Sequence, residues 1–304
     1  MSVFHKRETL VENITYMALM AAINVVFVLI AYFVPFMMFA LIFVLPLSST
    51  IVATYCKKRY YPIYAIATTG ICLLVTMMDI GDTIFIVIPS IITGFLFGIL
   101  IKQNIPSIIV IAAASVAQII LTYPGLLLVN EVIYPGQEDL FLTVSKAIGI
   151  SNESIVPYIK HLLIGTISLI QQILTFIVIK SEATKIGVNI EDKPWMDNLL
   201  PSLSIFIFST LSVIFAVFFK EIAYLFMLGS ALFGIYEIGS LILEKNKKIY
   251  IALVISAGLS IFLFAALYSA IPEPLGFLSV QILFCLVGII GFINNYLLTH
   301  SKKR

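Results

Sequence analysis

The chain has 304 residues, of which 61% are hydrophobic and only 11% are charged, and its formal net charge is +2. Charged residues make up about a quarter of a typical soluble globular chain, so this composition excludes an ordinary soluble domain. So small a net charge, with Lys and Arg in short clusters, also argues against nucleic-acid binding. The composition predicts an all-α protein, a polytopic bundle of transmembrane helices.

Apolar runs of about 20 residues, each long enough to cross the roughly 30 Å hydrocarbon core of a bilayer as a helix, follow one another along the chain. They predict about ten spans, at 13–34, 36–55, 62–79, 83–101, 105–129, 158–179, 199–219, 222–243, 249–270 and 275–298. The first run is about twice as long as the apolar region of a signal peptide. No small-residue cleavage pattern follows it, so we expect an uncleaved first span.

The distribution of basic residues predicts the orientation of these spans. If the N-terminus lies in the cytoplasm, all but three of the 18 Lys and Arg residues fall at inner ends, the exceptions being Lys146, Lys160 and Lys220. Such a bias is the positive-inside rule. We therefore expect a multi-pass cell-membrane protein with both termini in the cytoplasm.

Two connections are unusually long. The outer one, 130–157, carries Leu140, Val144 and Ile148 four residues apart, as on one face of a short helix lying on the membrane. We expect it to cover an outward-facing site. The inner one, 181–198, contains charges of both signs and is interpreted as a linker between a six-helix membrane unit, 1–180, and a four-helix extension, 199–304.

Motifs for catalysis are missing from the sequence. It contains no G-x-x-x-x-G-K-[ST], no H-E-x-x-H and no G-x-S-x-G, so we expect neither an enzyme nor an ATPase of its own. The three cysteines, Cys56, Cys72 and Cys285, are isolated from one another and from the histidines. This spacing supports neither a disulfide framework nor a metal site, and we expect no cofactor.

Polar residues inside the apolar spans are more informative, because each needs a hydrogen-bond partner or a wet cavity. They are Asn24, Gln118, the adjacent Gln171 and Gln172, and Glu237, the only carboxylate deep within a span. The amides serve either to join helices or to bind a ligand. Glu237 serves either in binding or proton handling, or in a structural hydrogen bond. In both cases we expect it to face the protein interior, since lipid offers a carboxylate no partner.

Small residues form two pairs with a spacing of four. Ala18 and Ala22 make an A-x-x-x-A pair in the first span, and Gly94 and Gly98 make a G-x-x-x-G pair in the fourth. Each pair lets another helix approach closely. That helix belongs either to this chain or to a partner subunit, and we name the four residues as candidate docking positions.

The order of short motifs along the chain resembles the YybS-like family of bacterial polytopic membrane proteins. The motifs are Leu10-Val11-Glu12, Ala18-Leu19-Met20-Ala21-Ala22, Val34-Pro35, Phe43-Val44-Leu45-Pro46-Leu47 and Pro194-Trp195. That family is distantly similar to the substrate-binding S components of energy-coupling-factor transporters.

The resemblance implies that the first six helices form an S-component-like unit with both ends in the cytoplasm. S components capture a vitamin or metal ion from outside and dock by small-residue faces on a membrane coupling subunit driven by two ATPases. Ala18 and Ala22 match their A-x-x-x-A docking motif. Four additional spans distinguish this chain from an ordinary S component, and it carries no vitamin-binding motif of the riboflavin, thiamine, biotin or folate carriers.

The leading hypothesis is a transporter-like membrane subunit that binds an unidentified small molecule in an outward-facing pocket. Its candidate lining residues are Asp79, Asp82, Gln118, Tyr123, Asn130, Glu131 and Gln171. The expected partners are the lipid bilayer, the small molecule and a membrane coupling subunit with ATPases. The alternative is a non-transporting membrane scaffold whose amides and small residues serve packing and partner binding alone.

Overall fold

The computed structural model describes residues 7–34, 37–77, 80–133, 156–185, 199–243, 246–270 and 275–301. Within these ranges the regular secondary structure is entirely helical. The chain forms two compact units. Unit 1 comprises Met1–Gln137 and Ile167–Lys193, and unit 2 comprises Glu138–Thr166 and Pro194–Arg304.

The helices of unit 1 follow the predicted spans closely. They are α1 (Leu10–Phe33), α2 (Met38–Tyr55), α3 (Tyr61–Val75), α5 (Ile88–Lys102), α6 (Ser107–Leu127) and the second part of α8 (Val156–Lys185). Short turns connect or extend them: the 3-10 turn η2 (Lys58–Tyr60), the α-helical turn α4 (Ile80–Asp82), and the π-helical turns η3 (Thr83–Val87) and η4 (Leu128–Ile133).

Helix α1 begins at a capping box. The Thr9 hydroxyl accepts a hydrogen bond from the Glu12 amide at 3.2 Å, and the Glu12 carboxylate accepts one from the Thr9 amide at 3.1 Å. These bonds satisfy two amide groups that the helix itself cannot. One turn later the buried Asn13 accepts a hydrogen bond from the Lys57 amide at 2.8 Å. This bond ties the beginning of α1 to the connection between α2 and α3.

Pro46 lies inside α2 and has no amide hydrogen to donate to the carbonyl of Ile42, one turn earlier. The Thr175 hydroxyl of α8 donates to that Ile42 carbonyl at 3.4 Å. A side chain from another helix therefore supplies the donor that the proline removes.

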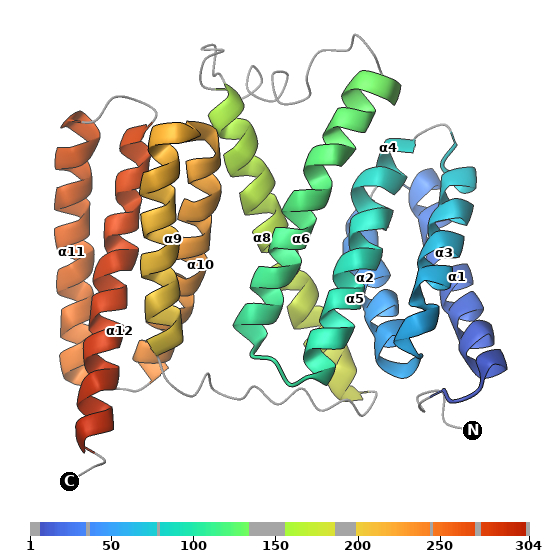
Figure 1. Ribbon diagram of the computed structural model, residues 1–304, viewed down its shortest axis with the longest axis horizontal. Helices are drawn as coiled ribbons and strands as arrows, with labels where there is room; N and C mark the ends of the chain where they lie inside the picture. Colours follow the sequence, from blue (N-terminus) through green and yellow to red (C-terminus); the bar gives the residue numbers. More distant parts are fainter. Residues whose placement is uncertain are drawn as a thin grey trace. The chain divides into compact units, whose positions relative to one another are not determined.

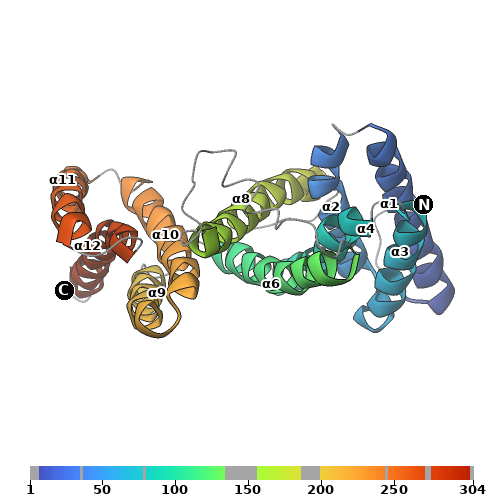
Figure 2. The same ribbon diagram turned by 90° about the horizontal axis from the view of Figure 1, so that it is seen from above.

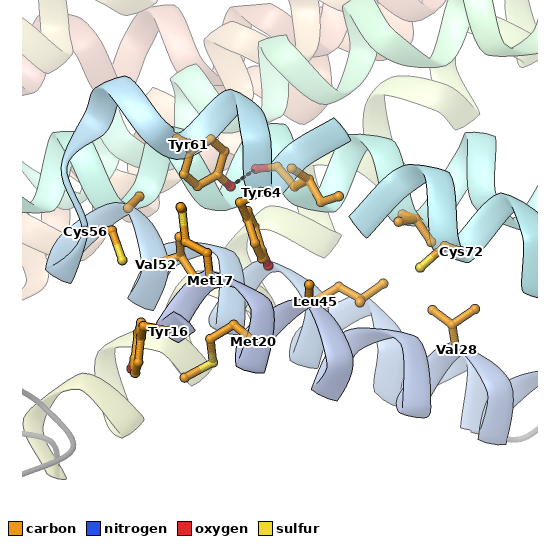
Figure 3. Close-up of a cluster of buried hydrophobic side chains, with 14 of the residues drawn as sticks. Tyr16, Met17, Met20, Val28, Leu45, Val52, Cys56, Tyr61, Tyr64 and Cys72 are labelled. Carbon is orange, nitrogen blue, oxygen red and sulfur yellow. Dashed lines mark hydrogen bonds between the residues drawn. The ribbon is translucent and has the colours of Figure 1, made fainter. Parts of the chain in front are cut away.

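The core of unit 1 lies between α1, α2, α3 and α5 and contains Met17, Leu45, Val52 and Tyr64 (Figure 3). The rings of Tyr61 and Tyr64 meet edge to face with centroids 5.3 Å apart. The Tyr61 hydroxyl also donates to the Ile91 carbonyl of α5 at 2.7 Å, so α3 is joined to α5 by a hydrogen bond as well as by apolar contact. Phe97 and Phe176 extend apolar packing to α8.

Unit 2 contains α9 (Leu199–Phe218), α10 (Lys220–Leu243), α11 (Lys247–Ala270), the 3-10 turn η6 (Leu275–Val280), α12 (Gln281–Ser301) and the first part of α8. Helix α10 packs closely on α9, α12 contacts both, and α11 contacts α12 (Figure 2). Stacked rings of Phe208 and Phe233, with centroids 5.6 Å apart, hold α9 against α10.

Seven helices in the described part of the chain are long and apolar enough to cross a membrane. They are Leu10–Phe33, Thr83–Lys102, Ser107–Ile133, Val156–Glu182, Leu200–Phe218, Ile222–Ile242 and Lys247–Leu267. Shorter apolar stretches lie at Ala40–Tyr55 and Leu278–Asn294. Large apolar side chains such as Ile66 and Phe262 are exposed on the helix surfaces, as expected where lipid replaces water.

The chain is thus a multi-pass, all-α membrane protein. Each of the ten predicted ranges contains a helix of the structure, but the shorter apolar stretches do not by themselves establish ten crossings. The full span count and the orientation of the termini stay predictions.

Candidate functional site

A buried hydrogen-bond network joins the first three helices. The Asn24 amide nitrogen donates to the Tyr64 hydroxyl at 2.7 Å, and the Asn24 carbonyl oxygen accepts from the Ser48 hydroxyl at 2.5 Å. Ser49 adds a 3.2 Å contact to the same tyrosine. Because Asn24 is fully buried and both ends of its amide are used, its role in unit 1 is to hold α1, α2 and α3 together.

Gly94 and Gly98 allow α5 to lie directly against α2. A Cβ atom added at Gly94 would lie 2.5 Å from the Ser49 Cβ, and one at Gly98 would lie 2.5 Å from the Ala53 Cβ. The Thr50 hydroxyl lies 3.1 Å from the Gly94 carbonyl that accepts its hydrogen bond. The G-x-x-x-G pair, a candidate docking position, is therefore occupied by a helix of the same chain.

Ala18 and Ala22 lie in a different environment. Both are exposed on α1, on the side away from the buried Met17 and Met20. No described helix of unit 1 covers them. The A-x-x-x-A face is thus open to lipid or to another subunit.

Two glutamines meet between α6 and α8. The Gln172 amide nitrogen lies 3.4 Å from the Gln118 carbonyl oxygen, and both side chains are buried. The Gln172 carbonyl oxygen has no hydrogen-bond partner among the described residues, and neither has the hydroxyl of Ser115, one turn before Gln118 on α6. We call Ser115, Gln118 and Gln172 the polar seam.

The polar seam contains two buried polar atoms that lack partners among the described residues. A buried carbonyl oxygen or hydroxyl without a partner is costly in a membrane protein, because no bulk water replaces the missing bond. All three side chains are neutral and can both donate and accept hydrogen bonds. Chemically they suit an uncharged polar group better than an ion.

The other described residues that were predicted to line the pocket do not gather at the polar seam. Gln171 is only partly buried, and its neighbour Gln172 makes the contact with Gln118. Tyr123 is partly buried five residues beyond Gln118, and hence on another face of α6. Asn130 and Glu131 lie in η4, beyond the end of α6, where Glu131 is exposed.

The acidic turn is described only in part. Asp79 lies outside the described residues, and so does the side chain of Asp82, whose backbone ends α4. The hydroxyls of Thr76 and Thr83, on either side of this turn, are 2.6 Å apart and hold η3 to the end of α3. Most of the predicted covering loop, 134–155, also lies outside the described residues.

Glu237 lies at the centre of unit 2. It is fully buried, which confirms the expected interior position, and its carboxylate accepts a hydrogen bond from the Ser202 hydroxyl of α9 at 3.3 Å. Gly291 of α12 lies so close that an added Cβ atom would overlap the carboxylate. The carboxylate thus fills a space enclosed by α9, α10 and α12.

Comparisons with protein-family models, with curated proteins and with solved structures give no significant match to this chain. The resemblance to the YybS-like family therefore stays a prediction based on short motifs. Among the residues that the structure describes, no three His, Cys, Asp or Glu side chains gather as the ligands of a metal ion would.

Proposed function

We propose that the chain is a transporter-like subunit of the cell membrane that binds a small, uncharged polar molecule at the polar seam of unit 1. The buried Gln172 carbonyl oxygen, which has no donor among the described residues, carries this proposal. A ligand N–H or O–H group would satisfy it, while Ser115 would offer a second hydrogen-bonding group from α6.

The route to the seam follows from the proposed orientation. With both termini in the cytoplasm, the outer end of α6 continues into η4, so that Asn130 and Glu131 lie at the entrance and the connection after them is external. The distribution of basic residues supports this orientation. We further propose that the chain has no ATPase of its own and docks on a membrane coupling subunit through the open Ala18 and Ala22 face.

A non-transporting scaffold is the second candidate function. The bonds of Asn24 and the contacts of Gly94 and Gly98 favour it, because these polar and small residues are already used within the chain. The two functions differ in what the polar seam does. A scaffold needs no ligand there.

Analysis of bound small molecules separates the two. We would purify the full chain from its membrane, extract it with organic solvent and compare the extract by mass spectrometry with extracts of Gln172→Leu and Gln171→Leu. A ligand at the seam should be present with the wild-type chain and Gln171→Leu, and lost with Gln172→Leu. If no extract contains a chain-specific small molecule, or if Gln172→Leu retains it, the scaffold function is favoured.

A further inference from the structure

A concave site lined by basic residues lies at one end of unit 1. At this end α1 and α3 begin and α2 and α5 end (Figure 1). Its volume is about 320 Å³, within the range of roughly 300–1,000 Å³ that is usual for small-ligand pockets. We call it the basic hollow. It is lined by Arg7, Cys56, Lys57, Lys58, Arg59 and Lys102.

The walls of the basic hollow are held by hydrogen bonds of the backbone. The Arg7 amide donates to the Tyr55 carbonyl at 2.9 Å, and the Lys57 amide donates to the Asn13 side chain at 2.8 Å. Arg7 is only 7% exposed, and its guanidinium carbon lies over the Tyr16 ring, 4.2 Å from the ring centroid. Two segments far apart in the sequence, the beginning of α1 and the end of α2, are therefore fixed around one space.

The charge of the lining has one sign. Five of the six lining residues are cationic and none is a carboxylate. The Lys57 ammonium donates to the Glu8 backbone carbonyl at 2.6 Å, and the Lys102 ammonium to the Thr54 carbonyl at 3.1 Å. Backbone carbonyls thus hold both ammonium groups in place at the hollow. Like charges gathered at the edge of a low-dielectric membrane repel one another, and a bound anion would offset that repulsion.

The type of anion follows from the donors. Arginine side chains present paired N–H groups that match phosphate oxygens, and lysines add compact charges around them. A phosphate group places its oxygen atoms tetrahedrally around one charged centre, so it can contact donors on several sides of the hollow at once. We propose that the basic hollow binds a phosphate group, carried by an anionic phospholipid headgroup or by a soluble phosphate.

The surroundings favour the lipid as the source. The hollow lies at the ends of membrane-spanning helices, the level at which lipid headgroups lie. Within two turns of Arg7, the apolar side chains of Leu10, Val11 and Ile14 are exposed on α1 and offer a surface for an acyl chain. This inference is independent of the polar seam, since it uses none of the same residues.

Titration of the purified full chain tests the proposal. Phosphatidylglycerol, phosphatidylcholine and inorganic phosphate would each be added to the detergent-solubilised protein, with thermal unfolding as the readout of binding. The test variant is Lys58→Gln/Arg59→Gln, which removes two exposed cations of the hollow. The control is Lys247→Gln/Lys248→Gln, which removes two exposed cations at the beginning of α11.

Phosphatidylglycerol should bind the wild-type chain and the control about equally, and Lys58→Gln/Arg59→Gln about 25-fold more weakly, at about fivefold for each cation removed. Phosphatidylcholine, which has no net charge, should bind weakly to all three. If inorganic phosphate alone shows the same dependence on Lys58 and Arg59, the phosphate site stands and its source is soluble. If phosphatidylglycerol and inorganic phosphate each bind Lys58→Gln/Arg59→Gln as well as they bind the control variant, the proposal is wrong. The basic cluster then serves only to orient the chain in the membrane.

Discussion

Two buried amides, Asn24 and Gln172, show how differently one chemical group is used in unit 1. Asn24 has a donor and an acceptor partner on two other helices. Gln172 has one long bond to Gln118, and its carbonyl oxygen has no partner among the described residues. A fully paired amide stabilises the fold, whereas a half-paired amide is available to a ligand.

Replacing each amide by leucine should therefore have unequal effects on stability. We expect Asn24→Leu to lower the free energy of unfolding by about 1–2 kcal/mol, since two interhelical hydrogen bonds are lost. Gln172→Leu should cost less, because the bond that Gln118 loses is long and the variant also removes an oxygen that lacked a donor. Unfolding in mixed micelles of increasing SDS content measures both, and equal losses would contradict the assignment of roles.

A second prediction for single residues concerns Glu237 and its neighbours. Glu237→Gln retains the bond to Ser202 and should fold normally, whereas Glu237→Leu removes this buried hydrogen bond and should cost about 1–3 kcal/mol. Gly291→Ala should cost about 1–3 kcal/mol as well, because its methyl group overlaps the carboxylate. The matched control is Gly258→Ala, since a Cβ atom at Gly258 has nothing within 4 Å.

At the scale of elements, the contact between α2 and α5 depends on the absence of side chains. Gly94 approaches the backbone of α2 itself, at the carbonyl of Pro46, so a side chain there cannot be relieved by a change of rotamer. An alanine at this position would push α2 and α5 apart. The hydrogen bond from the Thr50 hydroxyl to the Gly94 carbonyl would lengthen or break as a result.

Gly94→Ala should consequently destabilise unit 1 by about 1–3 kcal/mol. The control is Gly70→Ala on α3, where an added Cβ atom meets nothing within 4 Å. There alanine should be neutral or stabilise by up to about 1 kcal/mol, since it has the higher helix propensity. Thermal unfolding of the two variants against the wild type measures the difference, and a harmless Gly94→Ala would show that α2 and α5 can separate without loss.

For the small residues on the open face of α1 we expect no loss of stability, in contrast to Gly94. Ala18→Leu/Ala22→Leu should leave the bundle folded, because both positions are exposed. It should abolish capture of the proposed coupling subunit in a pull-down from the native membrane, since leucine prevents close approach of a second helix. Unchanged capture of a membrane partner by the folded variant would rule out docking at this face.

The positions of the helices were predictable from the sequence, and so was the interior position of Glu237, but the directions of most other side chains were not. Apolar runs between charges predict helices because bilayer thickness sets their length. The faces of such helices are hard to distinguish, since both lipid and protein interior accept apolar side chains. The sequence therefore could not tell Gln171 from Gln172, nor show that Gly94 packs against α2 while Ala22 is exposed.

At the scale of the whole molecule, orientation is the property on which the proposed binding route depends. A membrane-impermeant maleimide applied to intact cells should label a cysteine introduced as Glu138→Cys and leave one introduced as Lys247→Cys unlabelled. The physical reason is the strong bias of Lys and Arg toward the predicted inner connections. The reverse labelling pattern would remove both the orientation and the outward route to the polar seam.

The unmodified chain is the control for native thiols in that experiment. Burial raises the pKa of the Cys56 thiol to about 11, and the positive charge of Arg7 offsets only part of the increase. Because the thiolate is the reactive form, Cys56 should label very slowly at pH 7 in permeabilised cells. Its rate should rise about tenfold per pH unit until the pH approaches that pKa. Fast labelling at neutral pH would show that the end of α2 is open.

The missing amide hydrogen of Pro46 has a consequence for the sliding of one helix along another. Dispersion contacts between apolar side chains have no preferred direction, whereas a hydrogen bond has one. The hydrogen bond from the Thr175 hydroxyl to the Ile42 carbonyl forms only when α2 and α8 have one particular offset along their axes. A shift of one residue moves a helix by about 1.5 Å along its axis and would break a bond that is already 3.4 Å long. The proline thus leaves a carbonyl at which α8 makes a polar contact with α2 that depends on their relative height.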